Sequence, residues 1–269
     1  MLSDVTFGQY YPTTSFVHKM DARIKILLLI AYIVLVFVVK NFYGFIVVGA
    51  FLIIATIFSK VPFLSMLKSA SGILFILLLT VVLNLFFYKT ENPHIMFWII
   101  SYEAFYFASF MALRLITLVL GSMLLTYTTT PVALTDGIES LLKPLKWIKF
   151  PVHELALVMS IALRFIPILM SEADRIIMAQ KARGADFESG NVFKRAKALI
   201  PVLIPLLISA FRRAEELGDA MDSRCYSGSQ KRTKFRKLTC TWRDLVGTLF
   251  TAICITAVVL FNLYMGAIV

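Results

Sequence analysis

Charged residues are scarce in this sequence. Only 16% of its 269 residues are Asp, Glu, Lys or Arg, while 59% are hydrophobic. Soluble domains carry about 25% charged and about 45–50% apolar residues, so an ordinary water-soluble globule is excluded. Twenty-three phenylalanines and a mean hydropathy of +0.82 also exclude a disordered chain, which needs low hydrophobicity. A membrane protein is the class that remains.

The residues that usually form disulfides, metal sites and nucleotide-binding loops are also few. The three cysteines, at positions 225, 240 and 254, are odd in number and lack the close pairing of zinc or thioredoxin-like motifs. No glycine is followed by lysine, so the phosphate-binding loop of P-loop ATPases is absent. His153-Glu154 begins like a zinc-protease motif, but Leu157 stands where the second His is required. We therefore predict no catalytic residue and no metal site in this chain.

Long apolar runs predict about five transmembrane helices, because a bilayer core about 30 Å thick needs roughly 20 apolar residues in helical conformation. The predicted spans are 24–40, 42–58, 73–88 with a start near Ser69, 105–128, and 245–268. Lys25 is expected to snorkel from the first span to the membrane surface. Ile95–Ser101 is apolar but too short to cross, and we predict that it lies at the outer interface.

Positive charge orients these spans. Residues 131–243 carry a net charge of +8, out of +11 for the whole chain, whereas the opposite loops carry only Lys40, and Lys89 beside Glu91. Cytoplasmic loops of membrane proteins are enriched in Lys and Arg. The N-terminus and the long segment between the fourth and fifth spans are therefore predicted to be cytoplasmic, and the C-terminus extracellular. Nucleic-acid binding, another usual reason for a basic chain, is not favoured in a protein this apolar.

The long segment resembles neither a globular domain nor a set of spans. Its apolar runs, such as Leu155–Leu163 and Ala198–Phe211, are shorter than a span but more apolar than a solvated helix. Prolines and Ser189-Gly190 divide it into helices predicted near 132–147, 152–182 and 192–223, with kinks at the internal prolines. The predicted fold is an all-α integral membrane protein with four spans in 1–128, three kinked coupling helices in 129–243, and the last span in 244–269.

Two of these helices end in similar sequences, 41 residues apart. The aligned pairs are Ala173 with Ala214, Asp174 with Glu215, Ala179 with Ala220, and Arg183 with Arg224. Each segment places an Arg at the end of a helix, and Gly184 can take the left-handed conformation that ends the first one. A single Arg at such a position can simply cap its own helix. Its occurrence twice favours two matched contacts with two similar partners.

The whole chain resembles the transmembrane T component (EcfT) of energy-coupling factor transporters, which are ABC-type importers of vitamins and metal ions. The resemblance lies in the five spans, in the cytoplasmic helical segment before the last span, and in two Ala-Arg-Gly motifs there. Ala182-Arg183-Gly184 matches the first motif in full, whereas Ser223-Arg224-Cys225 keeps only the Arg. The stretch from Thr135 to Pro167 is also similar to the family.

This resemblance implies a non-catalytic subunit of a transporter in the bacterial cell membrane. In that family two cytosolic ATPases (EcfA and EcfA′) hold ATP and Mg²⁺, a membrane S component binds the substrate, and the T component couples them. The resemblance implies that Arg183 and Arg224 each contact one ATPase, and that this chain binds no cofactor itself. A stand-alone secondary transporter or channel is the alternative. Arg114 is the only charge well inside a span, and the other spans offer it no acidic partner.

A docking surface for the S component is also predicted on the cytoplasmic helices. Along 192–223 one apolar stripe can pack on a neighbouring helix of the same chain. Its members are Phe193, Ala196, Ile200, Leu203, Leu207, Ala210, Ala214, Leu217 and Met221. The other face is apolar as well, with Leu199, Val202, Leu206 and Ile208.

One neighbouring helix cannot cover both faces, so we predict that an apolar surface remains uncovered. This surface is formed together with residues 155–170 of the preceding helix, and the S component docks on it. Lipid headgroups or the rest of the subunit are the alternative occupants. The residues predicted at this surface are Leu155, Leu163, Phe165, Leu199, Val202, Leu203, Leu206 and Leu207.

Overall fold

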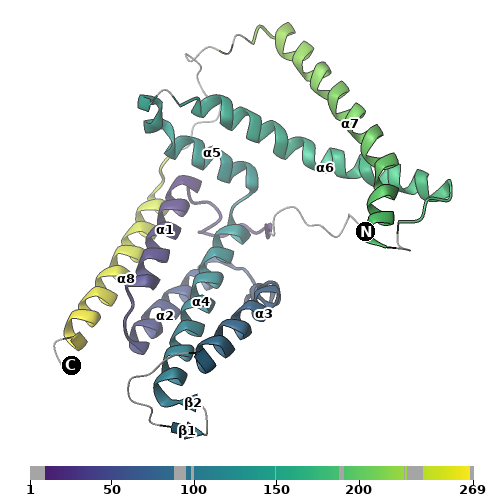
Figure 1. Cartoon of the computed structure of the whole chain (residues 1–269). Coiled ribbons are helices and arrows are strands. Elements are labelled where there is room, and N and C mark those ends of the chain that lie inside the picture. The colour runs from purple at the N-terminus through teal and green to yellow at the C-terminus, as the bar shows by residue number, and fades with distance from the viewer. Residues whose placement is uncertain are drawn as a thin grey trace. The chain divides into compact units, whose positions relative to one another are not determined.

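The computed structural model describes residues 10–87, 95–97, 100–148, 150–187, 191–226, 228 and 239–266. Within these ranges lie eight α-helices, one 3₁₀ helix and two short strands (Figure 1). The chain forms two compact units. The first combines Gly8–Leu141 with Lys237–Val269, and the second is built on Leu142–Arg236.

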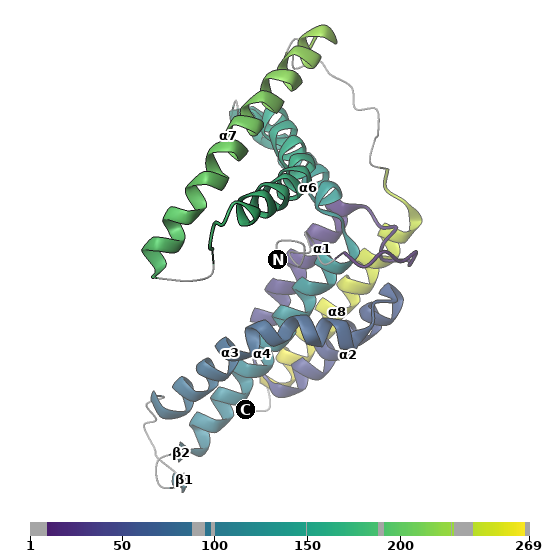
Figure 2. The ribbon, with the colours of Figure 1, turned by 90° about the vertical axis from the view of Figure 1, so that its right-hand side faces the viewer.

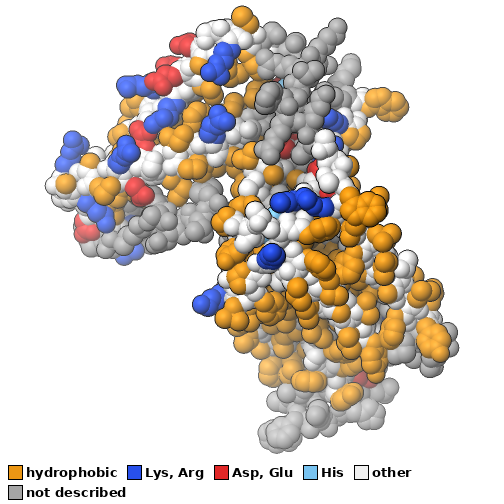
Figure 3. Space-filling model, turned by 180° about the vertical axis from the view of Figure 1, so that it is seen from behind, with side chains coloured by type: hydrophobic (Ala, Val, Ile, Leu, Met, Phe, Trp, Pro, Cys, Tyr) orange, Lys and Arg blue, Asp and Glu red, His pale blue; other side chains and the backbone are white. Residues whose placement is uncertain are grey.

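The first unit is a helical bundle. It contains α1 (Ala22–Val38), α2 (Phe42–Ser59), α3 (Phe63–Phe87), α4 (Tyr102–Thr128), α5 (Pro131–Leu141) and α8 (Trp242–Gly266). Its core includes Val36, Val48 and Val258, which are fully buried. The outward faces are just as apolar, and Figure 3 shows hydrophobic side chains covering the bundle surface. A soluble protein rarely exposes so large an apolar patch, so lipid is the solvent that fits this bundle.

The predicted spans correspond to α1, α2, α3, α4 and α8, which confirms an all-helical membrane fold. Four of them, α2, α3, α4 and α8, are long and apolar enough to cross a membrane. The remaining one, α1, has 17 residues, which is the lower limit for a span. Within Ile95–Ser101 lie two antiparallel strands, β1 (Ile95–Phe97) and β2 (Ile100–Ser101), which the apolar run did not predict, and the location of this segment at the outer interface stays a prediction.

The predicted start of the third span is too late. The helix α3 begins at Phe63, so the connection from α2 is only Lys60-Val61-Pro62. Pro62 cannot continue α2, but its carbonyl accepts the first hydrogen bonds of α3, from Ser65 and Met66. Lys68 lies inside this helix at an exposed position, and its charge hid the true start because it interrupts the apolar run.

The expectation that the apolar runs of 152–182 are too short to cross is also wrong. The helix α6 (Val152–Ala182) continues through Arg164 and Pro167, and one 18-residue stretch of it has a mean hydropathy of 1.8. A single Arg lowers the mean hydropathy too little to end the run. Length and composition therefore do not separate α6 from a span, and its cytoplasmic location stays a prediction based on charge.

Lys25 does not snorkel to the membrane surface. Its side chain is only 6% exposed, and Nζ donates to the carbonyl oxygen of Thr128 at 2.9 Å and to Oγ1 of Thr129 at 3.3 Å. The last carbonyls of a helix lack intrahelical partners and carry partial negative charge. The buried ammonium therefore caps the C-terminus of α4 and joins it to α1.

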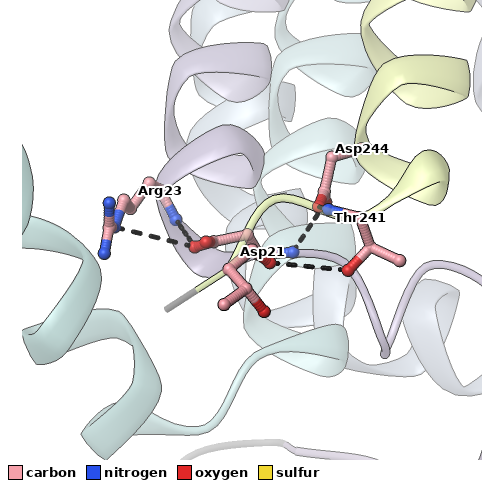
Figure 4. Close-up of polar contacts among 5 residues, drawn as sticks. Asp21, Arg23, Thr241 and Asp244 are labelled. Atoms are coloured by element: carbon pink, nitrogen blue, oxygen red, sulfur yellow. Dashed lines mark hydrogen bonds and ion pairs between the residues drawn. The ribbon is translucent and has the colours of Figure 1, made fainter. Parts of the chain in front are cut away.

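A buried carboxylate joins the first turns of α1 and α8 (Figure 4). Asp244 is 2% exposed and accepts hydrogen bonds from the backbone N–H groups of Asp21, at 2.8 Å, and Thr241, at 2.7 Å. Asp21 in turn caps α1 by accepting from the N–H of Arg23 at 3.0 Å. Both helices thus begin at the same end of the bundle, as expected if each enters the membrane from the cytoplasm.

The first helix of the predicted coupling segment belongs to the bundle. In α5, Gly137 lies so close to α1 that a Cβ added there would come within 3.2 Å of Ala22 and 3.1 Å of Ile26. The helix ends at Leu141, short of the predicted 147, and the 3₁₀ helix η1 (Lys143–Ile148) follows because Pro144 interrupts the α-helical pattern. The two compact units meet in sequence at Leu142, inside the predicted 129–243 segment.

Candidate functional site

The second unit contains η1, α6 and α7 (Val192–Ser223), and its two long helices cross each other (Figures 1 and 2). Glu172 of α6 joins them. Its Oε1 accepts from the hydroxyl of Ser209 at 2.8 Å, and its Oε2 forms an ion pair with Nη2 of Arg213 at 2.7 Å. We call this contact the Glu172 joint.

Apolar side chains line the space between the helices beside this joint. Those from α6 are Ile161, Phe165 and Leu169, and those from α7 are Ala210, Ala214, Leu217 and Met221. The C-terminal half of the stripe on 192–223 therefore lies beside α6, although Ala214 within it is exposed. Its N-terminal half, from Phe193 to Leu207, is exposed at the large residues Phe193, Ile200, Leu203 and Leu207.

The two charged residues of the Glu172 joint, Glu172 and Arg213, occupy equivalent positions in the internal repeat. Glu172 and Arg213 are 41 residues apart, as are Arg183 and Arg224. Each tip Arg therefore lies eleven residues beyond the joint on its own helix, a distance of about 16 Å along the helix axis. The unit thus carries two arms of equal length, which start from one shared contact and end in one Arg each.

The first arm ends in a Schellman cap. The N–H of Ala185 donates to the carbonyl oxygen of Gln180, and the N–H of Gly184 donates to that of Lys181, both at 3.0 Å. Gly184 has φ +84°, the left-handed conformation that this cap requires. Arg183 is the last residue before the chain turns away, and it is exposed at the tip of the helix.

The second arm ends in the same way, although its sequence keeps only the Arg of the motif. The N–H of Tyr226 donates to the carbonyl oxygen of Met221 at 3.0 Å, and the N–H of Cys225 donates to that of Asp222 at 2.9 Å. Cys225 has φ +57° and takes the place of Gly184. A left-handed conformation costs an L-residue about 1–2 kcal/mol, so the cap holds Cys225 in a conformation that is unfavourable for this residue type. Cys does not by itself predict this conformation, and only the repeat offset of 41 could have indicated it.

Both tips are open to solvent. Ala182, Arg183 and Gly184 are exposed at the first tip, and Ser223, Arg224 and Cys225 at the second. Among the residues that the structure describes, neither tip guanidinium has an ion-pair or side-chain hydrogen-bond partner. Two unpaired guanidinium groups, each with a planar fork of donors, are suited to bind carboxylates on other molecules.

The predicted docking residues divide into exposed and covered ones. Leu199, Leu203 and Leu207 are 45%, 58% and 59% exposed, and Phe211 follows at the same four-residue step with 63%. We call these four residues the exposed stripe of α7. Leu155 on α6 is also exposed, whereas Leu163 is half-buried.

Three predicted docking residues do not fit a free surface. Val202 is only 5% exposed, Leu206 is half-buried, and Phe165 lines the contact between α6 and α7. Val202 and Leu206 share a helix face with Ser209 and Arg213, the two residues that bind Glu172. Both faces of this helix are apolar, so hydrophobicity alone could not tell which one the chain itself covers.

Comparison with known proteins gives a consistent match over the whole chain. Residues 13–235 match the model of the family CbiQ, described as cobalt transport protein. A protein of Clostridium kluyveri is 47% identical over 99% of this chain and 100% of its own length. A protein of Ruminiclostridium cellulolyticum is 48% identical over 97% of this chain and 98% of its own length. A protein of Bacillus subtilis is 43% identical over 98% of this chain and 99% of its own length. All three are described as energy-coupling factor transporter transmembrane protein EcfT.

Proposed function

Because the chain belongs to the CbiQ family of cobalt transport proteins, we propose that it is the energy-coupling membrane scaffold of an ECF-type ABC importer. In this role it links two cytosolic ATPases to a membrane S component that binds the substrate. The transporter takes up a vitamin or another micronutrient, which the S component selects. The chain catalyses nothing itself, and its partners bind ATP and Mg²⁺.

The observation that carries this proposal is the pair of matched arms. Two helix tips have the same cap, lie equally far along their helices from the Glu172 joint and present one exposed Arg each. A single ligand or substrate would not need such a duplication. Two similar proteins, such as the halves of an ATPase dimer, would bind both tips in the same way, and the shared joint would couple their movements.

The alternative of a stand-alone secondary transporter is weakened by the surroundings of Arg114. Its Nη2 donates to the carbonyl oxygen of Val39, at the end of α1, at 3.1 Å. Its guanidinium also lies over the ring of Phe110, 4.9 Å from the ring centre. These contacts are those of a structural residue that caps a helix. An ion-coupling residue would instead face a pathway together with an acidic partner.

Copurification tests the proposed function directly. When the chain carries an affinity tag and is expressed with its genomic neighbours, we expect two ATPases and one small hydrophobic protein to copurify in mild detergent. The bound ATPases should hydrolyse ATP, and the isolated chain should not. A secondary transporter would be recovered alone and would still transport, and that result would reject the proposal.

The proposed topology places the C-terminus outside the cell and the segment between α4 and α8 inside. In a variant without the three native cysteines, a cysteine added after Val269 should react with a membrane-impermeant thiol reagent in intact cells. One placed at Ser189 should react only after the cells are opened. Both positions lie outside the described residues, so the expectation rests on charge alone. Labelling at Ser189 from outside would show that the coupling segment is extracellular, where it could not contact cytosolic ATPases.

A further inference from the structure

The short helix η1 presents an unusual side chain to solvent. Trp147 is 99% exposed, more than any other large hydrophobic side chain for which the structure gives an exposure. Leu145 and Phe150 beside it are 38% and 41% exposed. Trp has a large apolar surface with one N–H donor, which suits the boundary between hydrocarbon and water better than bulk water.

Lysines flank this aromatic residue in the sequence. The sequence from 143 to 149 reads Lys-Pro-Leu-Lys-Trp-Ile-Lys, with no acidic residue, and Lys143 is exposed. Lysines near the anionic cytoplasmic face of a membrane are each stabilised by the surface potential. Alternation of Lys with Leu, Trp and Phe is also typical of segments that lie in a membrane interface.

The helix η1 follows α5 closely in the sequence. Only Leu142 separates Leu141, the last residue of α5, from Lys143, the first residue of η1. The helix α5 packs through Gly137 on Ala22, in the first turn of α1. That turn is where α1 enters the membrane in the proposed topology, so the chain leaves α5 for η1 on the cytoplasmic side.

We propose that η1 is a membrane-surface anchor that binds anionic phospholipid headgroups. Trp147 lies in the interfacial region of the cytoplasmic leaflet, and the lysines contact the headgroup phosphates. The proposal rests on the cytoplasmic location of this segment but not on any ATPase contact. Charge complementarity favours a lipid surface over an apolar protein partner, because three lysines would be desolvated in an apolar interface. Since η1 precedes α6 directly, the anchor sets where the first arm begins relative to the bilayer.

Fluorescence of Trp147 in lipid nanodiscs tests this anchor. The chain has three tryptophans, so W98F and W242F leave Trp147 as the only one. With this variant in nanodiscs that contain brominated phosphatidylglycerol, we expect bromine to remove most of the emission. In brominated phosphatidylcholine the quenching should be clearly weaker. Replacing Lys143, Lys146 and Lys149 by Gln should abolish the difference between the two lipids, since each lysine near an anionic surface contributes about fivefold to partitioning.

A matched control places the single tryptophan elsewhere in the same unit. Glu216 is exposed on α7, and E216W with the three native tryptophans replaced by Phe should show little quenching in either lipid. Equal quenching of Trp147 and of the control, equal quenching in both lipids, or protection of Trp147 only after ATPases are added would each overturn the anchor. Because no partner is present in the first measurement, its failure is distinguishable from failure of the proposed coupling function.

Discussion

Replacing both tip arginines by alanine will abolish substrate uptake, although the chain still inserts into the membrane. Arg183 and Arg224 are exposed and unpaired among the described residues, so their loss removes no contact that holds the chain together. In the proposed complex each guanidinium is buried against an acidic groove of one ATPase. Truncating one partner of such a buried pair costs about 2–5 kcal/mol, or about 30-fold or more in affinity at each tip.

The measurement is uptake by cells together with recovery of the ATPases on the tagged chain. R212A is the matched control, because Arg212 is exposed on the same helix but lies far from the tip. That variant should transport normally. If R183A/R224A reaches wild-type levels in the membrane and still transports, the two arms are not the ATPase contacts.

Substitutions that change the backbone conformation at the tips test the same contacts in a second way. Both caps need a left-handed residue after the Arg, and only the first has glycine there. G184V keeps Arg183 but should disturb its direction, because a β-branched residue strongly disfavours φ +84°. C225G keeps Arg224 and removes a conformational cost, so it should bind ATPases at least as well as the native chain. Weaker binding by C225G would mean that the thiol itself is part of the contact.

Hydrophobicity predicted most of the fold, because lipid imposes it on every outward-facing residue. Spans and helical pieces were therefore correct to within a few residues, with two exceptions: Lys68 interrupts the apolar run of α3, and Pro144 ends α5 six residues before the predicted position. Lys25 shows the limit of this reasoning. A lysine at the end of a span can reach outward to water or inward to the carbonyls of α4, and the sequence is the same in both cases.

Tertiary contacts decided the remaining differences at the candidate site. The repeat identified both tip arginines, but only the backbone dihedral angles show that Cys225 adopts the same left-handed conformation as Gly184. The covered face of α7 was misassigned at Val202 and Leu206 because both faces are apolar. Ser209 was the available signal, since a polar residue inside an otherwise apolar stretch needs a partner, and Glu172 supplies it.

The exposed stripe of α7 should hold the S component, and glutamate substitutions there should release it. L203E and L207E place carboxylates in the middle of the stripe, at residues that are 58% and 59% exposed. In the free chain these carboxylates remain hydrated, so the fold should tolerate them. In the complex they would be desolvated against an apolar partner without a cation nearby, which costs several kcal/mol. We expect the S component to be lost from the purified complex and uptake to stop.

The position of the stripe separates this effect from loss of the ATPases. On α7, Leu207 precedes Ser209 and Arg213, the two residues that bind Glu172. The tip at Arg224 lies eleven residues beyond Arg213, so the new charges are remote from that ATPase contact. ATPases should therefore stay bound to L203E and L207E. V202E serves as the contrasting variant, because Val202 is 5% exposed and a carboxylate there should lower the stability of the chain itself. Normal amounts of S component on L203E/L207E would show that the S component does not dock on the stripe. Loss of the ATPases first would show that the stripe belongs to their interface.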